Sequence, residues 1–157
     1  MKNQAKDFTV EVEGIAAICP IGEKVGKQNL TDKKIPVFSC EGACIRGEIA
    51  RLAANLIGKK EPFRRACHGE MFTVPHSAMA QWTTEADRVI VIDGCFLRCH
   101  GRILKNLIGE EKMVQIDAYS LYRKYSDRFD IDSVPEGERK EVAQQVVDKT
   151  LQELTEQ

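Results

Sequence analysis

The chain has 157 residues, of which 43% are hydrophobic and 30% charged, and its formal net charge is −1. A chain of this length can bury a core without disulfide staples, whereas the small net charge and the scattered basic residues offer no footprint for nucleic acid or an anionic membrane surface. No apolar run approaches the ~20 residues that cross a bilayer, and residues 1–8 lack the apolar core of a secretory signal. We therefore expect a cytoplasmic protein with no nucleic-acid or membrane partner.

The first 34 residues are expected to form an N-terminal extension. Residues 8–13 alternate between apolar and polar side chains, which predicts a half-buried edge strand. Residues 15–21 are apolar and include Cys19, for which we expect a buried and chemically inert position. Residues 23–34 are lysine-rich and are expected to be a polar connection to the main domain, which we place at residues 35–157.

From residue 35 onward, strand patterns alternate with helix patterns. The predicted strands are residues 35–39, 63–67, 89–93 and 113–117. The predicted helices are residues 45–57, 77–86, 101–109 and 133–154, and a tyrosine-bearing loop precedes the last one. The second strand has the weakest signal, because Arg64 and Arg65 interrupt its apolar residues.

Two of these helices carry more detailed expectations. In the third helix, Ile103, Leu104, Leu107 and Ile108 are expected to form the apolar face. The last helix is expected to open with a capping box at residues 133–136. Its apolar face could either cover the sheet or join a homodimer, and the periodicity does not choose between the two.

This alternation predicts an α/β fold, a single doubly wound domain of the flavodoxin-like or Rossmann-like type. The sheet is expected to be mainly parallel, with helices on both faces, because right-handed crossovers connect its strands. We expect the second strand to lie outside the first and the third strand on the other side of the first. In that order, the turns after these three strands lie side by side at the carboxyl edge, where α/β proteins bind ligands.

Five of the six cysteines fall in those three turns. Cys40 and Cys44 follow the first strand, Cys67 follows the second, and Cys95 and Cys99 follow the third. Strands lie ~4.8 Å apart, so three strand ends span about 10 Å, a gap that short turns can bridge to build a tetrahedral site. Helix N-termini follow the turns and favour thiolate over thiol. The pattern therefore predicts a metal site, and zinc is the preferred ion because four thiolates suit it.

The same residues carry a family resemblance. The segment Ile92-Asp93-Gly94-Cys95 with Cys99, the segment Cys40-Glu41-Gly42 and the intervening Cys67 resemble the DGC-domain family over residues 37–116. The resemblance implies a cytoplasmic α/β protein that holds zinc through Cys40, Cys67, Cys95 and Cys99. A closed four-cysteine site implies a structural or sensory role. Cys44 is then a candidate additional ligand or a reactive thiol.

Three other readings of the cysteines stay open. A thiol–disulfide redox enzyme could use Cys95 with Cys99, or Cys40 with Cys44, as a dithiol pair near a helix N-terminus. An iron–sulfur protein is a second alternative, although no cluster-specific spacing is present. A catalytic metalloenzyme is a third, and it requires that one of the four cysteines leave its coordination position free. Whether the protein is an enzyme is left open.

Several residues near the cysteines have less specific expectations. His68 and His100 each follow a predicted ligand, so we expect them beside the ion without binding it, or at the surface. Asp93 is expected to hold its turn by accepting backbone hydrogen bonds. The arginines just inside the helices are expected to be solvated rather than to neutralise the thiolates. These are Arg46, Arg98 and Arg102.

Overall fold

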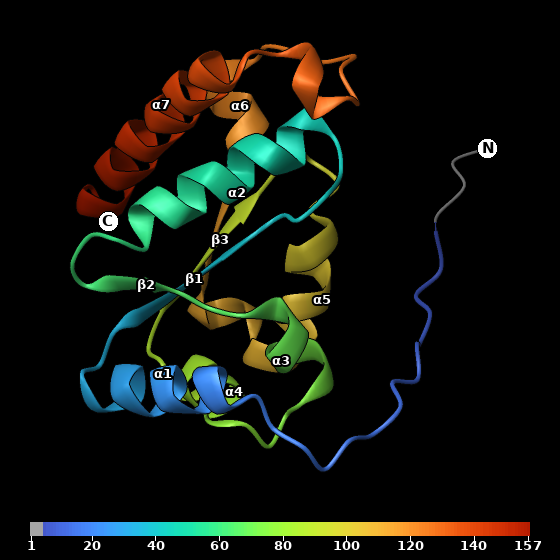
Figure 1. Cartoon of the computed structure of the whole chain (residues 1–157), viewed down its shortest axis with the longest axis vertical. Coiled ribbons are helices and arrows are strands. Elements are labelled where there is room, and N and C mark those ends of the chain that lie inside the picture. Colours follow the sequence, from blue (N-terminus) through green and yellow to red (C-terminus); the bar gives the residue numbers. More distant parts are fainter. Residues whose placement is uncertain (1–4) are drawn as a thin grey trace.

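A computed structural model describes residues 5–157 and shows one parallel sheet of four strands (Figure 1). The strands are β1 (Ile35–Ser39), β2 (Phe63–Arg65), β3 (Val89–Asp93) and β4 (Met113–Asp117). They lie in the order β2-β1-β3-β4, and every neighbouring pair is parallel. The predicted strand order is therefore confirmed, and β2 is two residues shorter than predicted.

Helices connect and cover these strands. They are α1 (Pro20–Thr31), α2 (Ile45–Ile57), α3 (His68–Thr73), α4 (Ala78–Glu85), α5 (Cys99–Ile108), α6 (Ala118–Tyr122) and α7 (Glu136–Thr155), with short 3₁₀ turns η1 (Glu110–Lys112) and η2 (Ile131–Ser133). Within the described part of the chain, no helix combines the length and the apolar character that crossing a bilayer requires.

Helices lie on both faces of the sheet because alternate residues of the central strands point in opposite directions. Ile90 and Ile92 of β3 join the core beneath α2, α6 and α7. Val89 and Val91 join the second core, with α3, α4 and α5. Figure 1 shows α2 and α7 together on one side of the strands and α3, α4 and α5 on the other. The doubly wound α/β architecture is confirmed.

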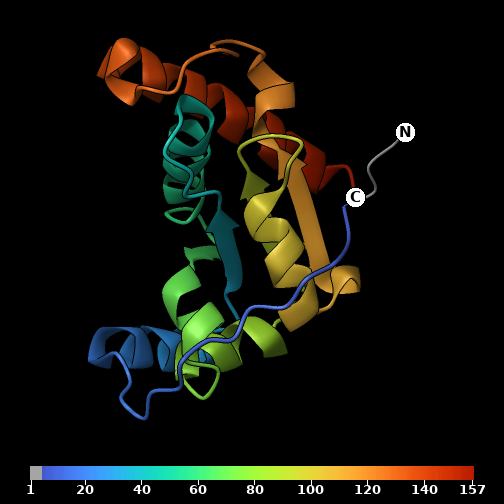
Figure 2. The same cartoon turned by 90° about the vertical axis from the view of Figure 1, so that its right-hand side faces the viewer.

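The N-terminal segment differs from its prediction. Residues 8–13 form no strand, and Figure 2 shows them as part of an extended trace that leads into α1. Their alternation buries nothing: the side chain of Phe8 is 83% exposed and that of Val10 is 69% exposed. A segment with alternating apolar and polar residues forms a strand only when a neighbouring strand provides hydrogen bonds and the apolar side chains have a core to pack against.

Helix α1 replaces the polar connection that was predicted over residues 23–34. Its buried residues are Gly22, Gly26 and Asn29, so it has no stripe of large apolar side chains. The absence of a side chain at Gly26 lets the α1 backbone approach α4, where an added Cβ would lie 2.7 Å from the Ala78 carbonyl oxygen. Hydrophobic periodicity therefore could not reveal this helix.

Cys19 is exposed, so the expected buried position is wrong. It occupies the N-cap of α1, where its Sγ accepts the backbone N–H of Gly22 at 3.4 Å. The main domain boundary at residue 34 stays a prediction.

Three further elements were missed or misplaced. The short helices α3 and α6 stand where a turn and a loop were predicted, and Asp117 caps α6 by accepting the Ser120 N–H at 3.3 Å. The predicted capping box does not form, because Ser133 belongs to η2 and its Oγ donates to the Asp130 carbonyl at 2.6 Å. Helix α7 instead begins at Glu136, with Pro135 at the N-cap.

The outer helices bury different amounts of their predicted apolar faces. In α5, Leu104 and Ile108 are buried, but Ile103 and Leu107 are 48% and 43% exposed. In α7, Val142 and Val146 are buried in the same core as α2. Helix α7 therefore covers the same face of the sheet as α2. The homodimer stays a prediction.

Candidate functional site

Four predicted ligands follow strands that are neighbours in the sheet. Cys40 comes directly after β1, Cys67 is the N-cap of α3 two residues after β2, Cys95 comes two residues after β3, and Cys99 opens α5. Because β2, β1 and β3 are adjacent and parallel, the turns that carry these cysteines lie together at the carboxyl edge. Cys44 is also near this edge, as the N-cap of α2.

Cys40 lies where the β1 and β3 turns meet. Its backbone N–H donates to the Ile92 carbonyl at 2.8 Å, and its half-buried Sγ accepts the Gly42 N–H at 3.3 Å. Burial raises the pKa of the Cys40 thiol, partly offset by backbone hydrogen bonds from Gly42 and Gly94, and nearby Cys99 contributes a further rise. Cys40 and Cys99, from different turns, are therefore close enough to interact electrostatically.

The turn between β3 and α5 is held at both of its ends. Gly94 packs on the first turn of α2, where an added Cβ would lie 3.0 Å from the Arg46 carbonyl oxygen. The Arg98 N–H donates to the Cys95 carbonyl at 3.1 Å, and Arg98 adopts a left-handed conformation with φ of 48°. This reversal allows α5 to begin at Cys99, four residues after Cys95.

Asp93 has the turn-holding role that was predicted for it. Its side chain is fully buried, and Oδ1 accepts the Gly101 N–H at 3.2 Å, while Oδ2 is buried without a hydrogen-bond partner. Burial raises the pKa of Asp93 to about 6, Asp117 contributes to the rise, and the Gly101 hydrogen bond opposes it. A buried, incompletely satisfied carboxyl thus borders the cysteine turn.

The two edge histidines form a cluster with aromatic side chains. The ring centroid of His68 lies 4.8 Å from that of His100, 5.0 Å from that of Phe38 and 5.6 Å from that of Phe72. His68 Nε2 and His100 Nδ1 are buried without hydrogen-bond partners. Burial lowers the pKa of His68 to about 4, aided by His100 and Arg65. Both histidines are half-buried, with one nitrogen of each ring facing protein, whereas His76 is exposed.

Arg65 is a positioning residue that the sequence interpretation treated only as an interruption of β2. Its guanidinium donates to the Asn55 side chain at 2.9 Å, to the Val37 carbonyl at 3.1 Å and to the Glu41 carboxylate at 2.9 Å. It thereby joins β2 to β1, to α2 and to the residue that follows Cys40. The sequence signal that could have revealed this role is a basic residue inside an apolar strand pattern.

Of the three arginines near the helix starts, Arg98 and Arg102 are exposed, as predicted, and Arg46 is half-buried; each also donates a hydrogen bond to a protein group. Arg46 donates to the Ser126 carbonyl at 2.8 Å and lies 4.1 Å from the centroid of the Tyr119 ring. Arg98 donates to the Gln115 side chain at 3.3 Å, and Arg102 donates to the Leu97 carbonyl at 2.9 Å.

The cysteine side chains do not come together as closely as the turns that carry them. Cys67 and Cys99 are exposed, Cys40, Cys44 and Cys95 are half-buried, and all are free thiols. Across residues 5–157, no group of three or more His, Cys, Asp or Glu side chains is arranged so that it could hold a metal ion. The edge nevertheless has the donor chemistry for zinc, because thiols and unpartnered imidazole nitrogens occur together there. The ligand set stays a prediction.

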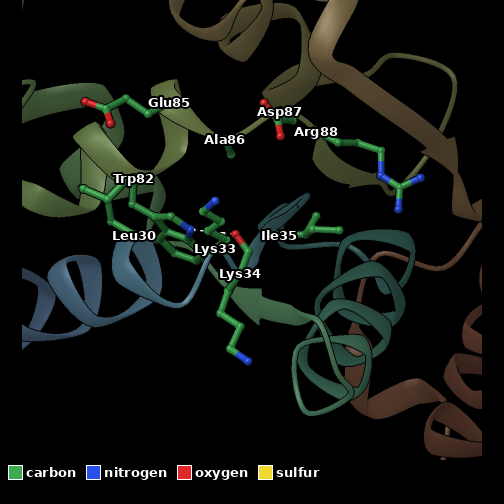
Figure 3. Close-up of a pocket in the computed structure, with 9 residues that line it drawn as sticks. All are labelled: Leu30, Lys33, Lys34, Ile35, Trp82, Glu85, Ala86, Asp87 and Arg88. Atoms are coloured by element: carbon green, nitrogen blue, oxygen red, sulfur yellow. Dashed lines mark hydrogen bonds between the residues drawn. The ribbon is translucent and has the colours of Figure 1, made fainter.

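A pocket of about 690 Å³ lies at the opposite edge of the sheet (Figure 3). It is bordered by Ile35, which opens β1, and by Arg88, which precedes β3. Trp82 Nε1 donates to the Lys34 carbonyl at 2.9 Å in its wall. Because open α/β sheets bind ligands outside the carboxyl ends of their strands, this pocket is not the favoured site.

The fold and the site together define an α/β protein with a cysteine-bearing carboxyl edge. A family model described as DGC domain matches residues 36–149, so the chain belongs to the DGC-domain family. No curated protein and no solved structure gives a significant match to the chain.

Proposed function

We propose that the protein binds one zinc ion at the carboxyl edge of the sheet through Cys40, Cys67, Cys95 and Cys99. The observation that carries this proposal is the order β2-β1-β3, which brings the three turns with these cysteines together. Membership of the DGC-domain family supports it, because the Asp-Gly-Cys triplet stands at residues 93–95, within the turn that supplies two of the ligands.

The geometry favours a structural or sensory role for the ion. Four cysteine ligands leave no coordination position for water or substrate, as is typical of structural zinc sites. An ion at this edge would link β1, β2 and β3 through their turns. In this proposal, Asp93 and Gly94 fix the turn that carries Cys95 and Cys99, while Arg65 fixes the loop after Cys40.

The thiol–disulfide alternative has weaker support. Of its two candidate pairs, Cys40 with Cys44 and Cys95 with Cys99, the first includes a thiol whose pKa is raised by burial, that of Cys40. A raised pKa reduces the thiolate fraction at neutral pH, and the thiolate is the reactive form in disulfide exchange. Thiol titration of metal-free protein with and without oxidant tests this alternative, and visible absorption of anaerobically purified protein tests for an iron–sulfur cluster.

Elemental analysis of purified and dialysed protein tests the zinc proposal. We expect one zinc per chain in the wild type, a loss of zinc in Cys40→Ser and in Cys95→Ser, and a lower melting temperature for both variants, since metal binding is coupled to folding. Cys19→Ser is the matched control, because Cys19 is an exposed thiol that caps α1 and is not one of the four proposed ligands. Equal zinc content in all three variants, or no zinc in the wild type, would overturn the proposal.

A further inference from the structure

The N-terminal segment has the sequence pattern of a strand but no strand to pair with. Residues 8–13 alternate between apolar and polar side chains, and Figure 2 shows them within an extended trace. The apolar side chains of this segment, those of Phe8, Val10 and Val12, are all exposed. A single chain therefore leaves uncovered an apolar row that cross-strand neighbours would bury.

Strand β4 lies at one edge of the sheet and is open to a further strand. Within residues 5–157, it pairs with β3 on one side and with no strand on the other. Proteins usually protect an edge strand by shortness, by lysine or by proline. β4 has five residues without lysine, arginine or proline, and its one charged residue, Asp117, caps α6. This edge therefore lacks the protection that β2 has.

The flank of this edge that faces α5 is basic. Gln115 of β4 points toward α5, because its side chain accepts from Arg98 at 3.3 Å and an added Cβ on Gly101 would lie 3.3 Å from its Oε1. Lys105 follows Gly101 by four residues, so it lies on the same side of the helix. Lys105 is exposed. A strand added outside β4 would therefore meet positive charge on this face.

The opposite face of the edge is apolar. Val114 belongs to the core beneath α2 and α7, but it is only half-buried there. The segment 8–13 matches both faces, because its apolar residues alternate with Glu11 and Glu13. When the carboxylates face Lys105, the apolar side chains point to the other side of the sheet and extend the apolar layer over Val114.

The connection to α1 disfavours pairing of the segment with the β4 of its own chain. Helix α1 begins beside α3, since Gly22 contacts Glu70, and α3 follows β2 at the far edge of the sheet. A strand outside β4 would lie four strand spacings, about 19 Å, from β2, with α5 in between because it packs on β3 and β4. Residues 14–19 span at most about 20 Å, which leaves no length for a path around α5.

We propose that residues 8–13 of one chain add a strand to the β4 edge of a second copy of this chain, and that the second copy reciprocates. In strand addition, main-chain hydrogen bonds give affinity and alternate side chains give specificity. Two reciprocal additions form a closed dimer. The inference is independent of the zinc proposal, and the fold of each chain does not require it, because the segment buries no side chain in the single chain.

Sedimentation of the full-length chain over a wide range of concentrations, under reducing conditions, tests the dimer. We expect a reversible monomer–dimer equilibrium, and hydrogen exchange should show that the amides of residues 8–13 become protected as the dimer forms. A chain that stays monomeric at every concentration would overturn the proposal. Protection of residues 8–13 in the monomer would also overturn it, because the segment would then pair within its own chain.

Proline variants test the added strand. In the double variant Thr9→Pro with Val10→Pro, one of the two lost N–H groups faces β4 in any register, so we expect the dimer dissociation constant to rise by about tenfold or more. The matched control is Ala16→Pro with Ala17→Pro, in the same exposed stretch but outside residues 8–13. It should leave the dimer unchanged, and neither variant should alter unfolding of the monomer. Equal effects on the dimer would refute the role of residues 8–13.

Charge reversal tests which surface receives the strand. We expect Glu11→Lys and Lys105→Glu each to raise the dimer dissociation constant by about two- to fivefold, and the two changes together to restore it. Lys60→Glu is the control, because this exposed lysine lies between α2 and β2, near the other edge. It should neither weaken the dimer nor rescue Glu11→Lys. Rescue by Lys60→Glu instead of Lys105→Glu would contradict placement of the strand beside α5.

Discussion

Asp93 Oδ1 accepts the backbone N–H of Gly101 at 3.2 Å, so the last residue of β3 holds the first turn of α5. The cysteine turn between them is therefore closed by a hydrogen bond from inside the core. Asp93 also packs directly on the Gly101 backbone, where an added Cβ would lie 2.7 Å from Oδ2. The position of Cys99 thus depends on a glycine two residues further along the helix.

Gly101→Ala should test this packing. The added methyl group would push against a fully buried carboxyl, so we expect the free energy of unfolding to fall by about 1–3 kcal/mol in urea denaturation. The matched control is Gly137→Ala in the first turn of α7, where no atom lies within 4 Å of the added Cβ. That variant should gain about 0.5–1 kcal/mol, because alanine is the better helix former. Equal effects would contradict the packing argument.

Arg65→Lys should lower stability although it keeps the positive charge. The lysine ammonium cannot reproduce the separate bonds to Asn55, Val37 and Glu41, so we expect a loss of about 1–3 kcal/mol in the free energy of unfolding. Arg64→Lys is the control at the neighbouring position, where the side chain pairs with an exposed Glu61, and it should cost less than about 1 kcal/mol. A larger cost for Arg64→Lys would refute the positioning role of Arg65.

Leucine truncations on α5 should separate its buried side from its exposed side. Leu104 is fully buried and Leu107 is 43% exposed, although they are only three residues apart. We expect Leu104→Ala to cost about 2–5 kcal/mol in the free energy of unfolding and Leu107→Ala to cost less than about 1 kcal/mol. Similar costs, measured by thermal or urea unfolding, would mean that the whole apolar face is buried.

The apolar residues of the N-terminal segment should be dispensable for folding. Because Phe8 and Val10 are exposed, we expect the double variant Phe8→Ser with Val10→Ser to change the free energy of unfolding by less than about 0.5 kcal/mol. Leu30→Ser on α1 is the contrasting variant, because Leu30 packs against the core with α4 and α5, and it should be clearly destabilising. A destabilised double variant would show that the segment packs on the domain.

The central part of the fold could be predicted because its signals are local. The strands β1, β3 and β4 occupy the predicted residues, since continuous β-branched and apolar runs are required where both faces of a parallel sheet are covered. Helix α1 could not be predicted in this way, because glycines rather than large side chains make its contact with α4.

The candidate site was predictable only down to its turns. The sequence places cysteines at strand ends, and the strand order then brings those ends together. The direction of a side chain at the start of a helix depends on tertiary contacts such as those of His68 with Phe38 and His100. Adjacent donors such as Cys67 and His68 therefore cannot be distinguished from spacing alone.

The shortness and charge of β2 also have a consequence for self-association. An edge strand presents unpaired backbone groups to other molecules, and proteins limit this hazard with short strands and charged side chains. β2 has only three residues, two of which are Arg64 and Arg65. A second chain that added a strand here would gain few hydrogen bonds and would have to displace water from a guanidinium. The feature that weakens the strand signal thus protects the open side of the sheet from aggregation.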